Sequence, residues 1–170
     1  MVEEKIAVVP RVVVAAAFGP KHYGVLLTDT RMIFVLEKVS RAEMGAVLGG
    51  VIGAVLADAT AKKSEFVYAD ANPEALAKIE KSIVIPNASV RRVKMKAKLG
   101  GAYTIRLDYA DEAGKERKLT GILSPPDEQV SARRANGEKL NVILRDYAVK
   151  AQNAFKMVLP LGAAQESEWV

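Results

Sequence analysis

The sequence feature that most constrains the fold is the alternation of basic and apolar residues over residues 92–99, in the segment VRRVKMKAKL at 90–99. Between the apolar positions lie four cations, which are Arg92, Lys94, Lys96 and Lys98. A period of two places successive side chains on opposite faces of a strand. The segment therefore predicts a strand with one apolar face and one basic face. The segment YTIRLDY, residues 103–109, continues the pattern and predicts a second strand.

The connection between these two segments decides how they pair. A two-residue turn at the two intervening glycines would pair Lys96 with Ile105 and mix the two faces, because paired residues share a face. A three-residue loop at 99–101 with a bulge pairs Met95 with Ile105 instead and keeps the faces separate. We therefore predict the bulged hairpin.

Composition limits the number of domains and the kinds of site that the chain can have. The chain has 170 residues, half of them apolar, which suits a single domain over residues 1–160. It has no cysteine and one histidine, so disulfides, thiolate metal sites and multi-histidine metal sites are excluded, and we expect no cofactor. The N-terminus has acids before its apolar run, which is not typical of a signal peptide. These features predict a cytoplasmic protein.

An uncharged run, MGAVLGGVIGAVLA, occupies residues 44–57. Its fourteen residues would span ~21 Å as a helix, whereas a bilayer core needs ~20 apolar residues. Gly45, Gly49 and Gly53 recur every four residues and would form a stripe against which another backbone can pack. Two interpretations remain open: a helix buried in the core, or a self-association helix that makes a homo-oligomer.

The rest of the chain predicts strands followed by a long helix. We expect extended residues at 6–18, a turn at 19–24, a hairpin of 25–28 with 32–37, and a helical insertion at about 41–81 that ends in a short helix capped by Asn72. Strands are expected at 83–86 and 117–123, then a loop or poorly formed helix start at 124–137. An amphipathic helix at 137–159, with Leu140 in its apolar stripe, and a frayed tail at 161–170 complete the chain.

No catalytic motif accompanies these elements, so we expect no enzyme. The sequence has no phosphate-binding glycine loop, no dinucleotide fingerprint and no HExxH, and His22 is expected to be a turn residue. The candidate site is an anionic-ligand surface of Arg91, Arg92, Lys94, Lys96 and Lys98. It is either a solvated face partly neutralised by Asp108 or a surface that binds anionic lipid or another anionic ligand. Nucleic acid is disfavoured because aromatic residues do not alternate with the cations.

Two stretches resemble the PH-like superfold in its GRAM and bacterial PH-domain branch. YGVLLTDTRMIFVLE, residues 23–37, is similar to the opening hairpin of that branch with its Leu-Thr-x-x-Arg turn. IVIPNASVRRVKMK, residues 83–96, is similar to the later Ile-Pro segment that leads into a strand. The chain also resembles uncharacterised prokaryotic proteins with a Gly-rich helix inserted after the first hairpin. Lys21 and Arg31 are too few to carry phosphoinositide recognition over.

The sequence thus predicts an α+β fold: a bent antiparallel sheet or partial barrel with a C-terminal amphipathic helix and an inserted Gly-rich helix. PH-like folds host lipid, peptide and protein binding alike, so the fold does not name a ligand. We expect a non-enzymatic protein-interaction or adaptor module that self-associates through the Gly-rich helix. The alternative is a peripheral membrane module that binds anionic lipid through the basic strand.

Overall fold

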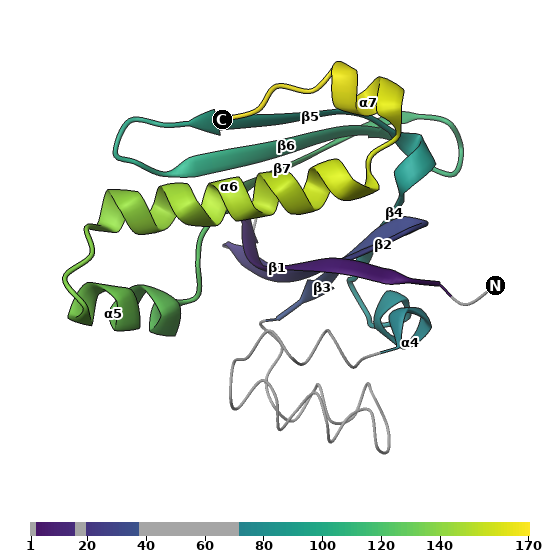
Figure 1. The fold of residues 1–170 in the computed structure, drawn as a ribbon. Coiled ribbons are helices and arrows are strands. Elements are labelled where there is room, and N and C mark those ends of the chain that lie inside the picture. Colours follow the sequence, from purple (N-terminus) through teal and green to yellow (C-terminus); the bar gives the residue numbers. More distant parts are fainter. Residues whose placement is uncertain (1–2, 16–19, 38–71) are drawn as a thin grey trace.

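The computed structural model describes residues 3–15, 20–37 and 72–170. They form an α+β fold whose single antiparallel sheet has seven strands in the order β4-β3-β2-β1-β7-β6-β5 and does not close (Figure 1). The strands are β1 (Lys5–Val14), β2 (Lys21–Thr28), β3 (Arg31–Leu36), β4 (Ile83–Pro86), β5 (Val90–Ala97), β6 (Tyr103–Ala110) and β7 (Glu116–Leu123). The described helices are α4 (Pro73–Ala77), η1 (Asn87–Ser89), α5 (Asp127–Ala135), α6 (Leu140–Val158) and α7 (Leu161–Gln165). The predicted fold class is confirmed at this level.

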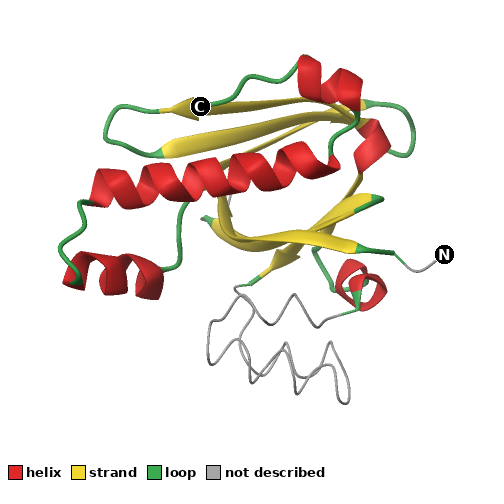
Figure 2. Ribbon diagram, in the orientation of Figure 1, coloured by secondary structure: helices red, strands yellow, loops and turns green. Residues whose placement is uncertain are grey.

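The sheet is arranged as two layers, with β5–β7 in one layer and β1–β4 in the other, and α6 runs along the opening between them (Figure 2). Strand β1 joins the layers. It pairs with β2 over most of its length, but with β7 only through Val12, Val13 and Val14. The seam between the layers is therefore a short ladder of three residue pairs.

A register shift in β1 between Val9 and Val12 lies next to this seam. It frees the backbone of Arg11 from the ladder. The hydroxyl of Tyr147 on α6 accepts a hydrogen bond from the Arg11 N–H at 2.7 Å and donates one to the Arg11 carbonyl at 2.9 Å. Buried backbone groups must be satisfied somewhere, and here a side chain from the long helix does so.

The main core lies between the two layers and the inner face of α6. Phe34 and Phe155 are fully buried there, together with the inward side chains of β5 and β6. Helix α6 begins at Leu140 rather than 137, and it buries Ile143, Tyr147, Ala151 and Phe155 as expected. Leu140 itself is exposed, so its predicted place in the apolar stripe was wrong.

The first hairpin is longer than the sequence predicted. Residues 21–24, expected to form a turn, belong to β2, where Tyr23 pairs with Val12 on one side and Leu36 on the other. The Tyr23 ring packs edge-on against Phe34 at a centroid distance of 6.4 Å. Packing of a large aromatic side chain in a central strand outweighs the turn propensity of the neighbouring glycine.

The β5–β6 hairpin has the predicted register and loop. Met95 pairs with Ile105, and the loop comprises residues 99–101. The Lys98 carbonyl accepts a hydrogen bond from the Gly101 N–H at 3.1 Å, and the Lys98 N–H donates one to the Ala102 carbonyl at 2.7 Å. Gly100 and Gly101 both have positive φ, which glycine adopts without strain. The predicted cap also forms, because the Asn72 side chain accepts from the Glu74 N–H at the start of α4.

Two predictions for the C-terminal third need correction. Of the two alternatives for residues 124–137, a loop or a poorly formed helix start, the structure has a formed helix, α5, whose acidic first turn and basic last turn complement the helix dipole. Arg133 ties α5 to α6 by pairing with Glu138 and with Asp146 at 2.6 Å. Residues 161–170 are not frayed: α7 forms, and the segment after it pairs with β5. The predicted Gly-rich helix at 44–57 lies outside the described residues.

Candidate anionic-ligand surface

The candidate surface is built on the face of β5–β7 that points away from the core. Strand β5 buries Val93 and Met95, so its alternate residues lie on the outward face. Strand register aligns these with residues of β6 and β7 in three rows. We call this set the outer face: Arg92, Asp108 and Lys118 in the first row, Lys94, Arg106 and Thr120 in the second, and Lys96, Thr104 and Ile122 in the third. The alternation of β5 therefore produces the predicted basic face.

Asp108 is the acidic centre of the outer face. Arg92 reaches its carboxylate at 2.8 Å from one side and Arg106 at 2.7 Å from the other. Its side chain is only 14% exposed, so these pairs are better shielded than ordinary surface pairs. Burial alone would raise the pKa of Asp108, but hydrogen bonds from Arg106 and Arg92 outweigh it and hold the pKa below its usual value. Arg92 and Arg106 are therefore committed to a structural contact.

Glu168, beyond the long helix, supplies a second carboxylate. It pairs with Lys94 and, at 3.2 Å, with Lys96, and these hydrogen bonds lower the pKa of Glu168. The backbone fixes this position: the Glu168 N–H donates to Val93 at 2.9 Å, and its carbonyl accepts from Met95 at 2.8 Å. The segment thus lies parallel along the free edge of β5. Sequence reasoning missed this contact because its partners are 74 residues apart.

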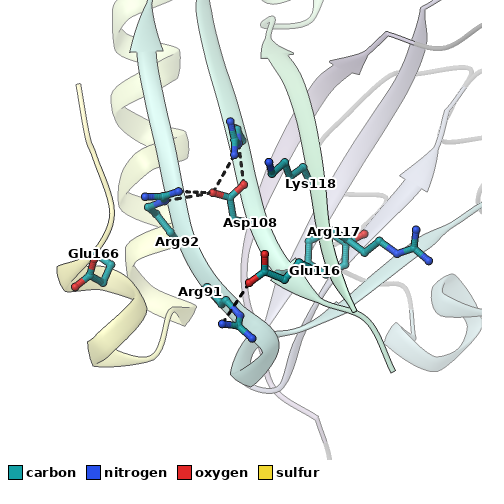
Figure 3. Close-up of a pocket in the computed structure, with 9 residues that line it drawn as sticks. Arg91, Arg92, Asp108, Glu116, Arg117, Lys118 and Glu166 are labelled. Carbon is teal, nitrogen blue, oxygen red and sulfur yellow. Dashed lines mark hydrogen bonds and ion pairs between the residues drawn. The ribbon is translucent and has the colours of Figure 1, made fainter. Parts of the chain in front are cut away.

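An open pocket of about 320 Å³ lies at the end of the outer face away from the β5–β6 loop. Its lining is Arg91, Arg92, Arg106, Asp108, Tyr109, Glu116, Arg117, Lys118 and Glu166 (Figure 3). Arg91 points to Glu116 at 3.5 Å, and both side chains are more than half exposed. Arg117 points away from Asp108 and pairs with Asp111 at 2.8 Å. The pocket is thus lined mainly by charged residues and is partly open to solvent.

Two lysines on this side have no acidic partner within 4.0 Å among the residues that the structure describes. They are Lys98, next to the hairpin loop, and Lys118, in the first row of the outer face. Both side chains are exposed. Of the five predicted surface residues, Arg91, Arg92, Lys94 and Lys96 therefore have carboxylate partners and Lys98 does not. Lys118 was not in the predicted set because strand pairing alone brings it beside Arg92 and Asp108.

The arginine of the first hairpin, Arg31, has a structural contact. Arg31 pairs with Glu3 at 2.7 Å and with Glu74 at 2.5 Å, and thereby ties the start of the described chain and α4 to the β2–β3 turn. The hydrogen bond from Arg31 is the largest cause that lowers the pKa of Glu3 to about 2. Thr28 and Thr30 also bond to this carboxylate. The guanidinium of Arg31 is thus paired with two carboxylates of its own chain.

The remaining predicted positions add no chemistry to the surface. His22 lies in β2 opposite Val13 rather than in a turn, and its carbonyl accepts from Glu37 at 2.8 Å. Gly45, Gly49 and Gly53 lie outside the described residues. Over residues 3–15, 20–37 and 72–170, no group of three or more His, Asp or Glu side chains is arranged to hold a metal ion. None of the described helices has both the length and the apolar composition to cross a membrane.

Comparisons with known proteins leave the interpretation to the geometry. No family model, no curated protein and no solved structure matches this chain.

Proposed function

We propose that this chain is a non-enzymatic binding module of PH-like architecture that associates peripherally with anionic membranes through the outer face of β5–β7. Three features support the architecture. The open sheet has the order given above, with the long helix α6 after its last strand. The two stretches that carry the resemblance form the β2–β3 hairpin and the β4–β5 segment.

The observation that carries the membrane proposal is the excess of cations on one exposed side of the molecule. The carboxylates there are Asp108, Asp111, Glu116, Glu166 and Glu168. The cations outnumber them and are Arg91, Arg92, Lys94, Lys96, Lys98, Arg106, Arg117 and Lys118. Each basic residue near an anionic leaflet contributes about 1 kcal/mol of attraction.

The ion pairs on this side differ in how easily a lipid phosphate can compete with them. Exposed pairs such as Arg91 with Glu116 contribute only ~0–1 kcal/mol, so exchanging the carboxylate for a phosphate costs little. The pairs of Asp108 are shielded and stay in place. The cations available to a membrane are therefore Arg91, Lys96, Lys98 and Lys118. Contact between these exposed side chains and lipid phosphates needs no enclosed pocket.

The test is charge reversal at the two lysines without an acidic partner. The double substitution Lys98→Glu and Lys118→Glu should weaken co-sedimentation with phosphatidylserine vesicles at least tenfold, since it removes two attractive charges and adds two repulsive ones. Reversing Lys94 would be a poorer test because it would also break the contact with Glu168. Thermal stability should not change, because both side chains are exposed.

A matched control carries the same change in net charge elsewhere. Lys78→Glu with Lys150→Glu alters two exposed lysines, the first at the C-cap of α4 and the second in α6, away from the outer face. This variant should keep most of its vesicle binding. Equal losses in the two double variants would show that net charge alone governs binding and would contradict a defined surface.

Self-association through Gly45, Gly49 and Gly53 stays a prediction, because these residues lie outside the described part of the chain. It is compatible with membrane binding, since a dimer would present two outer faces. Gly49→Leu tests it by sedimentation equilibrium: a folded monomer supports the interface, and a folded dimer contradicts it.

A further inference from the structure

The tip of the β5–β6 hairpin presents a large apolar side chain to solvent. Leu99 is fully exposed, with 106% relative accessibility, while the Lys98 backbone on one side of it is fixed by two hydrogen bonds. The two glycines that follow have positive φ and no neighbours within 4 Å of an added Cβ. The loop thus holds Leu99 on a narrow tip, where the two residues that follow it have no side chain.

Lysines and a second apolar residue lie at the same end of the outer face. Lys98 precedes Leu99, and Lys96 belongs to the third row, whose β7 member Ile122 is 45% exposed. No acidic residue occurs between Ala97 and Thr104. This end therefore combines apolar side chains with positive charge, the composition that suits a boundary between acyl chains and anionic headgroups.

The opposite end of the same half-sheet has a different composition. The β6–β7 turn contains Asp111, Glu112 and Lys115, is followed by Glu116 at the start of β7, and has no large apolar side chain. Consecutive hairpins of an antiparallel sheet lie at opposite ends, so β5–β7 has one basic, apolar end and one polar end, where Asp111 and Glu116 pair with Arg117 and Arg91. An anionic bilayer would therefore favour the first end.

We infer that the β5–β6 hairpin is a membrane-insertion loop: Leu99 enters the acyl boundary of an anionic bilayer while Lys96 and Lys98 contact lipid phosphates. A narrow convex tip suits a deformable bilayer better than a protein surface, where an anchor residue is surrounded by a ring of close contacts. This inference rests on the proposed membrane function and adds to it the inserted residue and the orientation of the domain.

The absence of cysteine from the chain permits a direct test. Leu99→Cys and, as the matched control, Ala113→Cys in the exposed β6–β7 turn are each labelled with an environment-sensitive nitrobenzoxadiazole fluorophore. With vesicles of phosphatidylserine and phosphatidylcholine, the label at 99 should shift to the blue and be quenched by lipids spin-labelled in the acyl chain. The label at 113 should do neither.

A second variant measures the contribution of the leucine itself. Leu99→Ser should weaken vesicle binding about tenfold, as expected for loss of a buried leucine side chain, and should leave thermal stability unchanged. Val149→Ser, which removes an exposed apolar residue of α6, is the matched control and should bind as the original chain does.

The outcomes separate this inference from the proposed function. Sedimentation with anionic vesicles, combined with an unchanged label at 99 and full affinity of Leu99→Ser, would overturn the insertion loop and keep the membrane function. Failure of the unmodified chain to sediment with anionic vesicles would overturn both.

Discussion

The two halves of the sheet differ in whether their outward faces are buried. In the β1–β4 half, β2 and β3 are buried on both faces: Leu27 and Phe34 lie in the main core, and Leu26 and Ile33 lie in a second cluster with Leu76 of α4. In the β5–β7 half, only the inward face is buried. Its outward face carries arginine, lysine and threonine side chains that are partly or fully exposed.

This difference separates stability from binding. A half-sheet covered on both faces removes more apolar surface from water, and this removal is the main favourable contribution to folding. A half-sheet covered on one face leaves a rigid surface whose side chains can change with little effect on the fold. The charged residues are located on that surface, and charges placed between the covered layers would need paired partners to offset desolvation.

The largest expected effect on stability comes from comparing the truncation of an outward-facing side chain in the β1–β4 half with the same kind of truncation in the β5–β7 half. Leu26→Ala should destabilise the protein by about 2–5 kcal/mol, because it empties a fully buried site between β2 and α4. Thr120→Ala, on the outer face of β7, should change stability by less than about 0.5 kcal/mol. Urea unfolding of both variants checks the comparison. Similar losses would show that the two outward faces are equally important for folding.

The next effect concerns the seam between the halves. A Cβ added at Gly121 would lie 2.5 Å from a methyl group of Val12 and 3.2 Å from the carbonyl of Val13. Gly121→Ala should therefore cost about 1–3 kcal/mol, measured by thermal unfolding, because β1 and β7 must move apart. Gly162→Ala, where nothing lies within 4 Å, is the control and should leave stability unchanged or slightly higher. Unchanged stability of the Gly121 variant would mean that the seam is not closely packed.

The smallest effect on stability accompanies a gain in binding. Glu168→Gln removes the carboxylate that pairs with Lys94 and Lys96, so it should cost less than about 1 kcal/mol of stability. The same change makes the outer face more positive and should strengthen vesicle binding about fivefold at low salt. Glu80→Gln, an equal change of charge beside α4, is the control for titrations against phosphatidylserine vesicles. Equal gains would point to net charge rather than to the outer face.

Local patterns were sufficient to predict much of the β5–β7 half. The alternation around Met95, together with the two glycines, predicted both the strand faces and the register with Ile105, because mixing the faces would expose apolar residues. The cap at Asn72 was equally local. Where two local signals competed, as at Tyr23, burial in a central strand determined the structure and the turn prediction failed.

Contacts between distant residues could not be predicted. Nothing near Glu168 in the sequence indicates that it pairs with Lys94, because the contact depends on how α6 and α7 return the chain to β5. The aromatic ring of Trp169 lies 5.0 Å from the Lys156 ammonium and packs on the core, which explains why this segment is ordered. The sequence thus identified the cations on and beside β5, but not Lys118 on β7 and not most of the carboxylates that neutralise the surface.

The most direct test of the central claim is co-sedimentation of the unmodified chain with neutral and with phosphatidylserine-containing vesicles across a range of salt concentrations. Binding to an exposed basic face is screened over about 10 Å at 0.1 M salt and over about 3 Å at 1 M. The account predicts binding to the anionic vesicles at low salt, its progressive loss as salt rises, and little binding to neutral vesicles. Equal binding to both vesicles, or no binding to either at low salt, would contradict it.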